Sequence, residues 1–89
     1  MLSENTAMPW YVYVLGCGDG TLYTGITTDV QHRLTVHRSG KGAKYTRGRG
    51  PLELLFQEEQ PDKSTALRRE YQIKQLSKLQ KLKLCGIMK

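Results

Sequence analysis

The sequence has no hydrophobic run of the roughly 18 residues that a membrane span requires, and its N-terminus lacks the pattern of a signal peptide. Its 89 residues leave no room for a second hydrophobic core. Cysteine is scarce, since only Cys17 and Cys85 occur, far apart and outside any metal-binding spacing. We therefore expect free thiols, neither a disulfide nor a zinc site, and a soluble protein located in the cytoplasm.

Each sign of charge is missing from long stretches of the chain. No base precedes Gln31, no acid lies between Gln31 and Gly50, and no base lies between Pro51 and Asp62. The 14 Lys and Arg residues, against 8 Asp and Glu, thus form two basic blocks on either side of an acidic one, with a net charge of +6. Such a field suits a polyanion, through phosphate neutralisation and counterion release. A solvated surface that keeps the protein soluble is the alternative.

Periodicity and turn residues predict the element order ββαβαα. We expect strands over residues 10–15, 21–26 and 52–57, and helices over about 30–39, 63–75 and 78–84. The expected N-caps are Thr28 or Asp29, Asp62 or Ser64, and Ser77. The fold class is α+β, a small three-stranded antiparallel sheet flanked by helices. One domain is expected over residues 9–85, between tails 1–8 and 86–89.

The first two strands carry tyrosines of one parity. A turn centred near Gly18 pairs Tyr13 with Tyr23 and Tyr11 with Gly25. Two phenols then project together, beside an open spot over the glycine where a ligand or another chain can approach. The alternative is that these tyrosines simply pack on the core, because tyrosine is a common strand residue.

The first helix places Arg33 and His37 one turn apart, at the border of its apolar face. Both side chains should therefore lean toward the sheet. An arginine can bind a phosphate with two donors, and a histidine can accept or donate a proton near neutral pH. An arginine at the edge of an amphipathic helix, with no role in chemistry, is an equal alternative.

Glu70 is an anomaly of the second helix. At 100° per residue it falls inside the apolar arc, which comprises Ala66, Leu67, Tyr71 and Ile73. Because an unpaired carboxylate on a buried face is costly, Glu70 should have a partner. That partner could be Lys74 one turn later, an arginine from elsewhere, or a divalent cation such as Mg²⁺.

Tyr13, Tyr23 and Arg33 follow one another at intervals of ten residues, and the chain continues with His37, Lys44-Tyr45-Thr46 and Glu70. This ordered set, over about residues 9–80, resembles the GIY-YIG nuclease superfamily, and within it the small stand-alone bacterial branch. The resemblance implies the GIY-YIG fold and a place in the bacterial cytosol or nucleoid.

The resemblance also implies a role for each matched residue. Tyr13 and Tyr23 order and activate the attacking water, and Arg33 stabilises charge on the scissile phosphate. His37 carries a proton or contacts phosphate, so the general base is Tyr13, Tyr23 or His37. Glu70 is the single protein ligand of one Mg²⁺ or Mn²⁺ ion.

The sequence departs from the family pattern in three respects. The first motif reads Tyr-Val-Tyr, without the family's Gly and Ile. Ile26 follows Gly25, where some branches carry a lysine, which removes one cation from the site. We also expect no DNA-targeting module of the kind that other members use.

Two functions follow from these observations. The first is a metal-dependent endonuclease that hydrolyses phosphodiester bonds in DNA, in repair or in processing of unusual DNA structures, with nucleic acid as its partner and no obligate protein partner. The second is a non-catalytic DNA- or RNA-binding module on the same fold. Besides the C-terminal lysines, the expected nucleic-acid contacts are Arg38, Lys41, Lys44, Tyr45, Thr46, Arg47, Arg49 and Lys74. A protein adaptor that docks through residues 77–84 is a third possibility.

Overall fold

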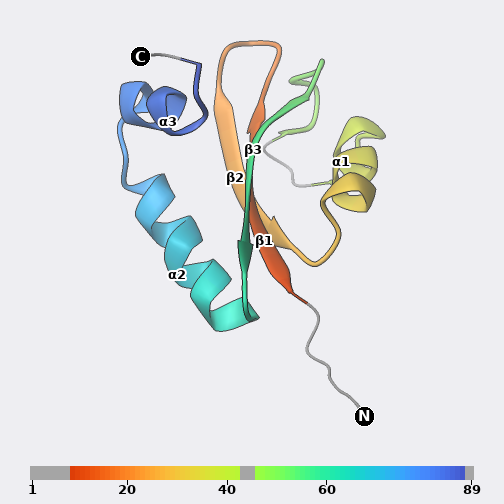
Figure 1. Cartoon of the computed structure of the whole chain (residues 1–89). Coiled ribbons are helices and arrows are strands. Elements are labelled where there is room, and N and C mark those ends of the chain that lie inside the picture. The colour runs from red at the N-terminus through yellow and green to blue at the C-terminus, as the bar shows by residue number, and fades with distance from the viewer. Residues whose placement is uncertain (1–8, 43–45, 88–89) are drawn as a thin grey trace.

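A computed structural model describes residues 9–42 and 46–87 of the chain. Along the chain lie β1 (Trp10–Gly16), β2 (Leu22–Thr27), α1 (Val30–Arg38), β3 (Glu53–Gln60), α2 (Lys63–Lys74) and α3 (Lys78–Leu84). The strands form one antiparallel sheet in the order β2-β1-β3 (Figure 1). The predicted element order and fold class are therefore confirmed.

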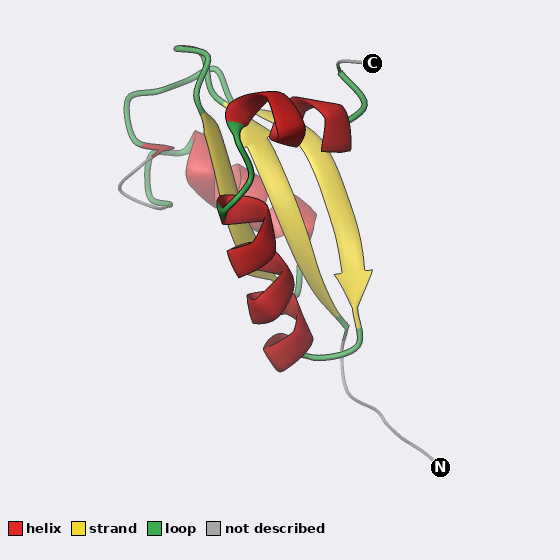
Figure 2. Ribbon diagram, turned by 90° about the vertical axis from the view of Figure 1, so that its left-hand side faces the viewer, coloured by secondary structure: helices red, strands yellow, loops and turns green. Residues whose placement is uncertain are grey.

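The sheet has a helical layer on each face. Figure 2 shows α2 and α3 in front of the sheet and α1 behind it. Alternation along β1 supplies both cores, because Tyr13 and Leu15 pack with Leu34 of α1, whereas Val12 and Val14 pack with Ala66 and Ile73 of α2. Residues of one parity thus belong to the α1 face and those of the other parity to the α2 face.

Local signals in the sequence set where the helices begin. Asp29 caps α1 by accepting from the His32 N–H, and Asp62 caps α2 by accepting from the Thr65 N–H. Ser77 and Gln80 form a reciprocal capping box at the start of α3. Among the described helices none is long and apolar enough to cross a membrane.

The predicted register of the β1–β2 hairpin was wrong by two residues. Tyr13 pairs with Gly25, and Leu15 pairs with Tyr23. The turn is centred on Asp19 instead of Gly18, because the Asp19 carboxylate accepts from both the N–H and the hydroxyl of Thr21. The Tyr13 phenol therefore lies over Gly25, where an added Cβ would stand 2.7 Å from its Oη. The expected open spot over the glycine is filled by this ring.

Strand β3 extends three residues beyond the predicted end and carries an irregularity. Val14 pairs with Phe56 and Leu15 with Leu54, so Leu55 is an extra residue on β3. Such a bulge changes which face the following residues point to. Leu54 consequently packs with the α1 core and Phe56 with the α2 core, although the two are only two positions apart.

Candidate active site

Three aromatic rings cluster on the α1 face of the sheet. The ring centroids of Tyr13 and Tyr23 lie 6.2 Å apart, and that of His37 lies 5.9 Å from Tyr13 and 5.2 Å from Tyr23. Each ring comes from a different element, namely β1, β2 and α1. The structure thus brings together three of the five residues predicted to carry chemistry.

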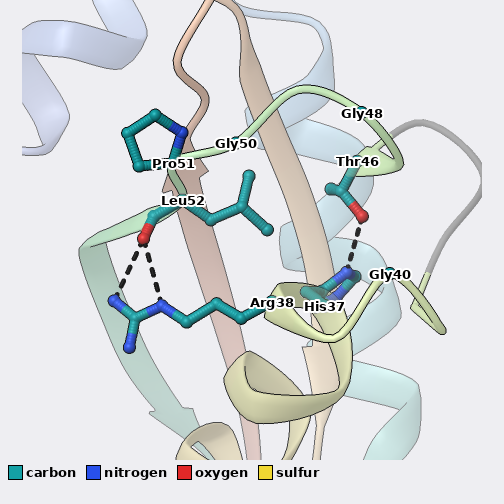
Figure 3. A pocket seen from close by; sticks show the side chains of 8 residues that line it. All are labelled: His37, Arg38, Gly40, Thr46, Gly48, Gly50, Pro51 and Leu52. Atoms are coloured by element: carbon teal, nitrogen blue, oxygen red, sulfur yellow. Dashed lines mark hydrogen bonds between the residues drawn. The ribbon is translucent and has the colours of Figure 1, made fainter.

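Both ring nitrogens of His37 are hydrogen-bonded. Nε2 lies 2.8 Å from Tyr13 Oη, and Nδ1 lies 2.9 Å from Thr46 Oγ1 (Figure 3). His37 and Thr46 are each only 2% exposed, and Gly42 passes so close to the His37 ring that no Cβ would fit. The imidazole is therefore held in one orientation by α1, β1 and the loop after α1.

Burial shifts the proton affinities of this pair in opposite directions. Burial and the neighbouring Tyr23 raise the pKa of Tyr13 to about 12, although a hydrogen bond and the positive charge of Arg33 act against the rise. Burial lowers the pKa of His37 below its usual value, and the charge of Arg33 lowers it further. At neutral pH, Tyr13 thus keeps its proton and His37 is uncharged.

Arg33 lies one helical turn before His37 and is half-buried. A hydrogen bond and the positive charge of its guanidinium lower the pKa of Tyr13, and the same charge lowers the pKa of His37, so Arg33 acts on both rings. The side chain therefore leans toward the sheet, as predicted from the helical periodicity. It supplies a positive charge beside the three rings, the feature that a phosphate would require.

Glu70 lies on α2, at the border of the buried stripe. Ala66 and Ile73 are fully buried, but Leu67 and Tyr71 are 45% and 67% exposed, so the apolar arc is narrower than predicted. The Glu70 side chain is 19% exposed, and Oε2 lies 3.4 Å from Lys74 Nζ. The intrahelical pair with Lys74, one of the predicted partners, is thus present but long.

The edge strand β2 links Glu70 to the aromatic cluster. A hollow of about 420 Å³ beside β2 is lined by Leu22, Tyr23, Thr24, Lys74 and Lys81. The residues that line it include Tyr23 of the aromatic cluster and Lys74, the partner of Glu70. Although α1 and α2 cover opposite faces of the sheet, β2 is an edge strand of the described sheet, and one residue from each side, Tyr23 and Lys74, lines the hollow there.

A metal ion at this site would depend on a single protein carboxylate. Within residues 9–42 and 46–87, no three His, Cys, Asp or Glu side chains gather as a ligand set. Glu70 alone fits a hydrated Mg²⁺ or Mn²⁺ ion, because Mg²⁺ keeps several waters and takes further oxygens from phosphate. The chemistry of the donor is therefore compatible with a hydrated divalent ion that also binds the substrate.

Several predicted nucleic-acid contacts have other partners. Two donors of Arg38 bind the Leu52 carbonyl at 3.2 and 3.0 Å, beside a cavity of about 300 Å³ (Figure 3). Arg49 pairs with Asp19 at 2.5 Å, which docks the loop on the hairpin turn. Thr46 was expected to contact nucleic acid, and in the structure its buried hydroxyl is bonded to His37 Nδ1.

Some of the other predicted nucleic-acid contacts lie in the described part of the chain and others do not. Lys41 and Arg47 are exposed, and Lys74 is half-exposed beside its partner Glu70. Lys44 and Tyr45 lie outside the described residues. Thr24 and Lys81 line the hollow beside β2. Sequence reasoning did not name Thr24 and included Lys81 only as one of the C-terminal lysines. The parity of β2 alone would have placed Thr24 on the α2 face.

The residues of the candidate site all lie in a part of the chain that matches a known protein family. The GIY-YIG catalytic domain family matches residues 9–83 of the chain. The chain belongs to the GIY-YIG family. Its match covers β1 with Tyr13, β2 with Tyr23, α1 with Arg33 and His37, and α2 with Glu70.

The relatives are small members of this family from distant organisms. The UPF0213 protein OB0043 of Oceanobacillus iheyensis is 57% identical over 83% of this chain and 86% of its own length. The UPF0213 protein VNG_2274C of Halobacterium salinarum is 61% identical over 80% of this chain and 92% of its own.

Two solved structures share the fold. The solution NMR structure of the UPF0213 protein BH0048 from Bacillus halodurans is 52% identical, with a TM-score of 0.57, over 90% of this chain and 85% of its own. The solution NMR structure of the protein EF2693 from E. faecalis is 40% identical, with a TM-score of 0.58, over 92% of this chain and 88% of its own.

We expect the free energy of unfolding to fall as the pH is lowered through 6.5, the usual pKa of histidine. The pKa of His37 is lower in the folded than in the unfolded chain, so the unfolded chain takes up more protons in this range. Its stabilising contribution is therefore complete above pH 6.5 and is lost as the pH falls. Urea unfolding between pH 7.5 and 5 measures the effect.

The second histidine provides the control for this prediction. His32 lies on the same helix but is exposed. The variant His32→Gln should keep the loss of stability at low pH, whereas His37→Gln should lose much of it. An equal pH dependence in both variants would contradict the assignment.

Proposed function

We propose that this protein is a metal-dependent endonuclease that hydrolyses phosphodiester bonds in DNA, in repair or in processing of unusual DNA structures. The observation that carries the proposal is the cluster of Tyr13, Tyr23 and His37 with Arg33 beside it. The GIY-YIG catalytic domain family matches residues 9–83, a span that includes all four of these residues. The net charge of +6 supports a nucleic-acid substrate.

Hydrolysis of a phosphodiester requires a positioned water and a counter-charge for the phosphate oxygens. Arg33 provides the counter-charge in this proposal. Tyr23, less buried than Tyr13, contacts the attacking water. Tyr13 keeps its proton, because its pKa is raised to about 12, and therefore orients the water and His37 instead of acting as the base.

His37 is the proton acceptor that best fits the described geometry. Its lowered pKa leaves the imidazole uncharged at neutral pH. The proton of the water reaches Nε2 through the Tyr13 phenol, which passes its own proton to His37 and takes one from the water, so that Tyr13 remains protonated. Thr46 holds the other ring nitrogen and so fixes the ring orientation. Glu70 would hold a Mg²⁺ or Mn²⁺ ion, which when bound would polarise the phosphate and assist the departing oxygen.

A plasmid-nicking assay tests the proposal. Supercoiled DNA should be converted to the nicked form by the purified full-length protein with Mg²⁺ or Mn²⁺, and EDTA should stop the conversion. Branched and linear duplexes of equal length, compared in the same assay, test the preference for unusual structures. Equal cleavage with and without EDTA would contradict a metal-dependent reaction.

The second candidate is a non-catalytic nucleic-acid-binding module. The observation in its favour is that Lys74 already provides a partner for Glu70, so the carboxylate does not require a metal. This candidate predicts salt-sensitive DNA binding without nicking under any metal condition. The nicking assay, run beside a binding titration, separates the two candidates.

A further inference from the structure

Two adjoining hollows lie along the outer edge of β2, beside α3. The hollow of about 420 Å³ described above shares Leu22 and Lys81 with a second one of about 220 Å³, which is also lined by Thr21 and Lys78. Together they form one depression, which we call the β2–α3 trough. Figures 1 and 2 show α3 lying across the end of the sheet near the start of β2. Tyr23, whose ring belongs to the candidate active site, is one of the residues that line the trough.

The wall of the trough contains a buried hydroxyl without a partner. Thr24 is 4% exposed, and in the described part of the chain its Oγ1 is the buried side-chain polar atom that has no hydrogen-bond partner in the protein. Thr24 has the same parity as Leu22 and Ile26, which pack in the α2 core, so it points to the face on which α2 and α3 lie. A buried hydroxyl without a partner is costly, so a bound group that supplies one is favoured there.

The charged residues that line the trough are all positive. Lys74, Lys78 and Lys81 contribute ammonium groups, and none of the described lining residues is an acid. Glu70 compensates part of the charge of Lys74 alone, at 3.4 Å. Lys78 Nζ also reaches toward Gly20 in the hairpin turn, so the positive charge continues past the end of β2. The shape, charge and free hydroxyl together suit a phosphate group.

We propose that the β2–α3 trough binds backbone phosphates that flank the scissile phosphate, with Thr24 Oγ1 and Lys81 Nζ as the contacts and Lys78 further along. The proposal rests on the proposed function for the source of the phosphate, namely a nucleic acid that already occupies the site at Tyr23. The nucleic-acid backbone then leaves the active site along the edge of β2 toward α3.

Binding of the full-length protein to a labelled DNA duplex in EDTA, over a series of salt concentrations, tests the proposal. Lys81→Gln should weaken binding and lower the slope of log K against log salt by about 1, the loss of one phosphate contact. Arg68→Gln removes one positive charge from the exposed side of α2, and Arg68 does not line the trough, so its slope should change much less.

The hydroxyl has its own matched pair of variants. Thr24→Val should weaken DNA binding by about tenfold, the order expected for a hydrogen bond to a charged group, without changing the salt slope. Thr24→Ser should retain most of the affinity. Thermal unfolding of Thr24→Val without DNA should show no loss of stability, because the variant removes a hydroxyl that lacks a partner.

The outcomes distinguish this proposal from the proposed function. If DNA is not cut but Lys81→Gln and Thr24→Val weaken binding as described, the trough is supported and the nuclease proposal fails. If the variants change binding of inorganic phosphate or pyrophosphate, followed by amide NMR shifts, but not of DNA, the nucleic-acid assignment is overturned. The proposal is also wrong if Lys81→Gln behaves like Arg68→Gln and Thr24→Val binds DNA like the parent.

Discussion

Glu70→Gln should lower metal-dependent DNA cleavage by about a thousandfold, with little effect on folding or on DNA binding in EDTA. The substitution keeps the size of the side chain but removes the charge that a divalent ion requires. Glu70 is 19% exposed and contacts Lys74 at 3.4 Å, so the expected cost to stability is that of a partly exposed intrahelical ion pair and is small. Nicking rates over a range of Mg²⁺ concentrations measure the effect.

The control for Glu70→Gln is a carboxylate far from the hollow. Glu59 lies on β3, the opposite edge of the sheet from β2, and is exposed. Glu59→Gln removes the same charge and should cut DNA at the parent rate. If Glu70→Gln also cuts at the parent rate, the proposed metal site with a single carboxylate is wrong. Circular dichroism verifies that both variants are folded.

Arg33→Gln should lower cleavage by about a hundredfold to a thousandfold, because a positive group directed at the phosphate is lost. It should also change proton affinities that can be measured without substrate. The charge of Arg33 lowers the pKa of both Tyr13 and His37, so its removal should raise both. An NMR titration of the His37 ring would show the upward shift directly.

Arg68→Gln is the matched control for Arg33→Gln, since Arg68 is exposed on α2. It should leave both the cleavage rate and the titration of His37 unchanged. If the pKa of His37 in Arg33→Gln is the same as in the parent protein, the guanidinium does not act on the cluster. Loss of cleavage together with an unchanged titration would instead place Arg33 on the substrate alone.

The elements of the fold were predictable because their signals are local. Asp29, Asp62 and Ser77 each cap the helix that follows, and the periodicity of β1 assigns its side chains to two cores. The hairpin register was not predictable in the same way. Three glycines allow the turn to form at more than one position, and the hydrogen bonds from Thr21 to the Asp19 carboxylate centre it on Asp19. The strand pairing therefore differs by two residues from the predicted one.

The candidate site was predictable only in part. The spacing of Tyr13, Tyr23 and Arg33 identified the family, and the family match confirms that identification. The spacing did not reveal that Thr46 holds His37, because the two residues come from different segments whose approach depends on packing. Arg38 and Arg49 were likewise expected to contact nucleic acid, and only the structure shows that Arg38 binds a backbone carbonyl and Arg49 binds a carboxylate.

The sequence by itself determined the family, the order of the elements and the excess of positive charge, because motif spacing, periodicity and charge are properties of neighbouring residues. Only the tertiary structure decided which charges are bound, which phenol lies over Gly25 and that Lys74, the partner of Glu70, lines the same hollow as Tyr23. Those outcomes depend on the register of β2 and on α1 and α2 covering opposite faces of the sheet. The edge strand β2 joins the two faces, and its side chains supply both Tyr23 of the cluster and Thr24 of the trough.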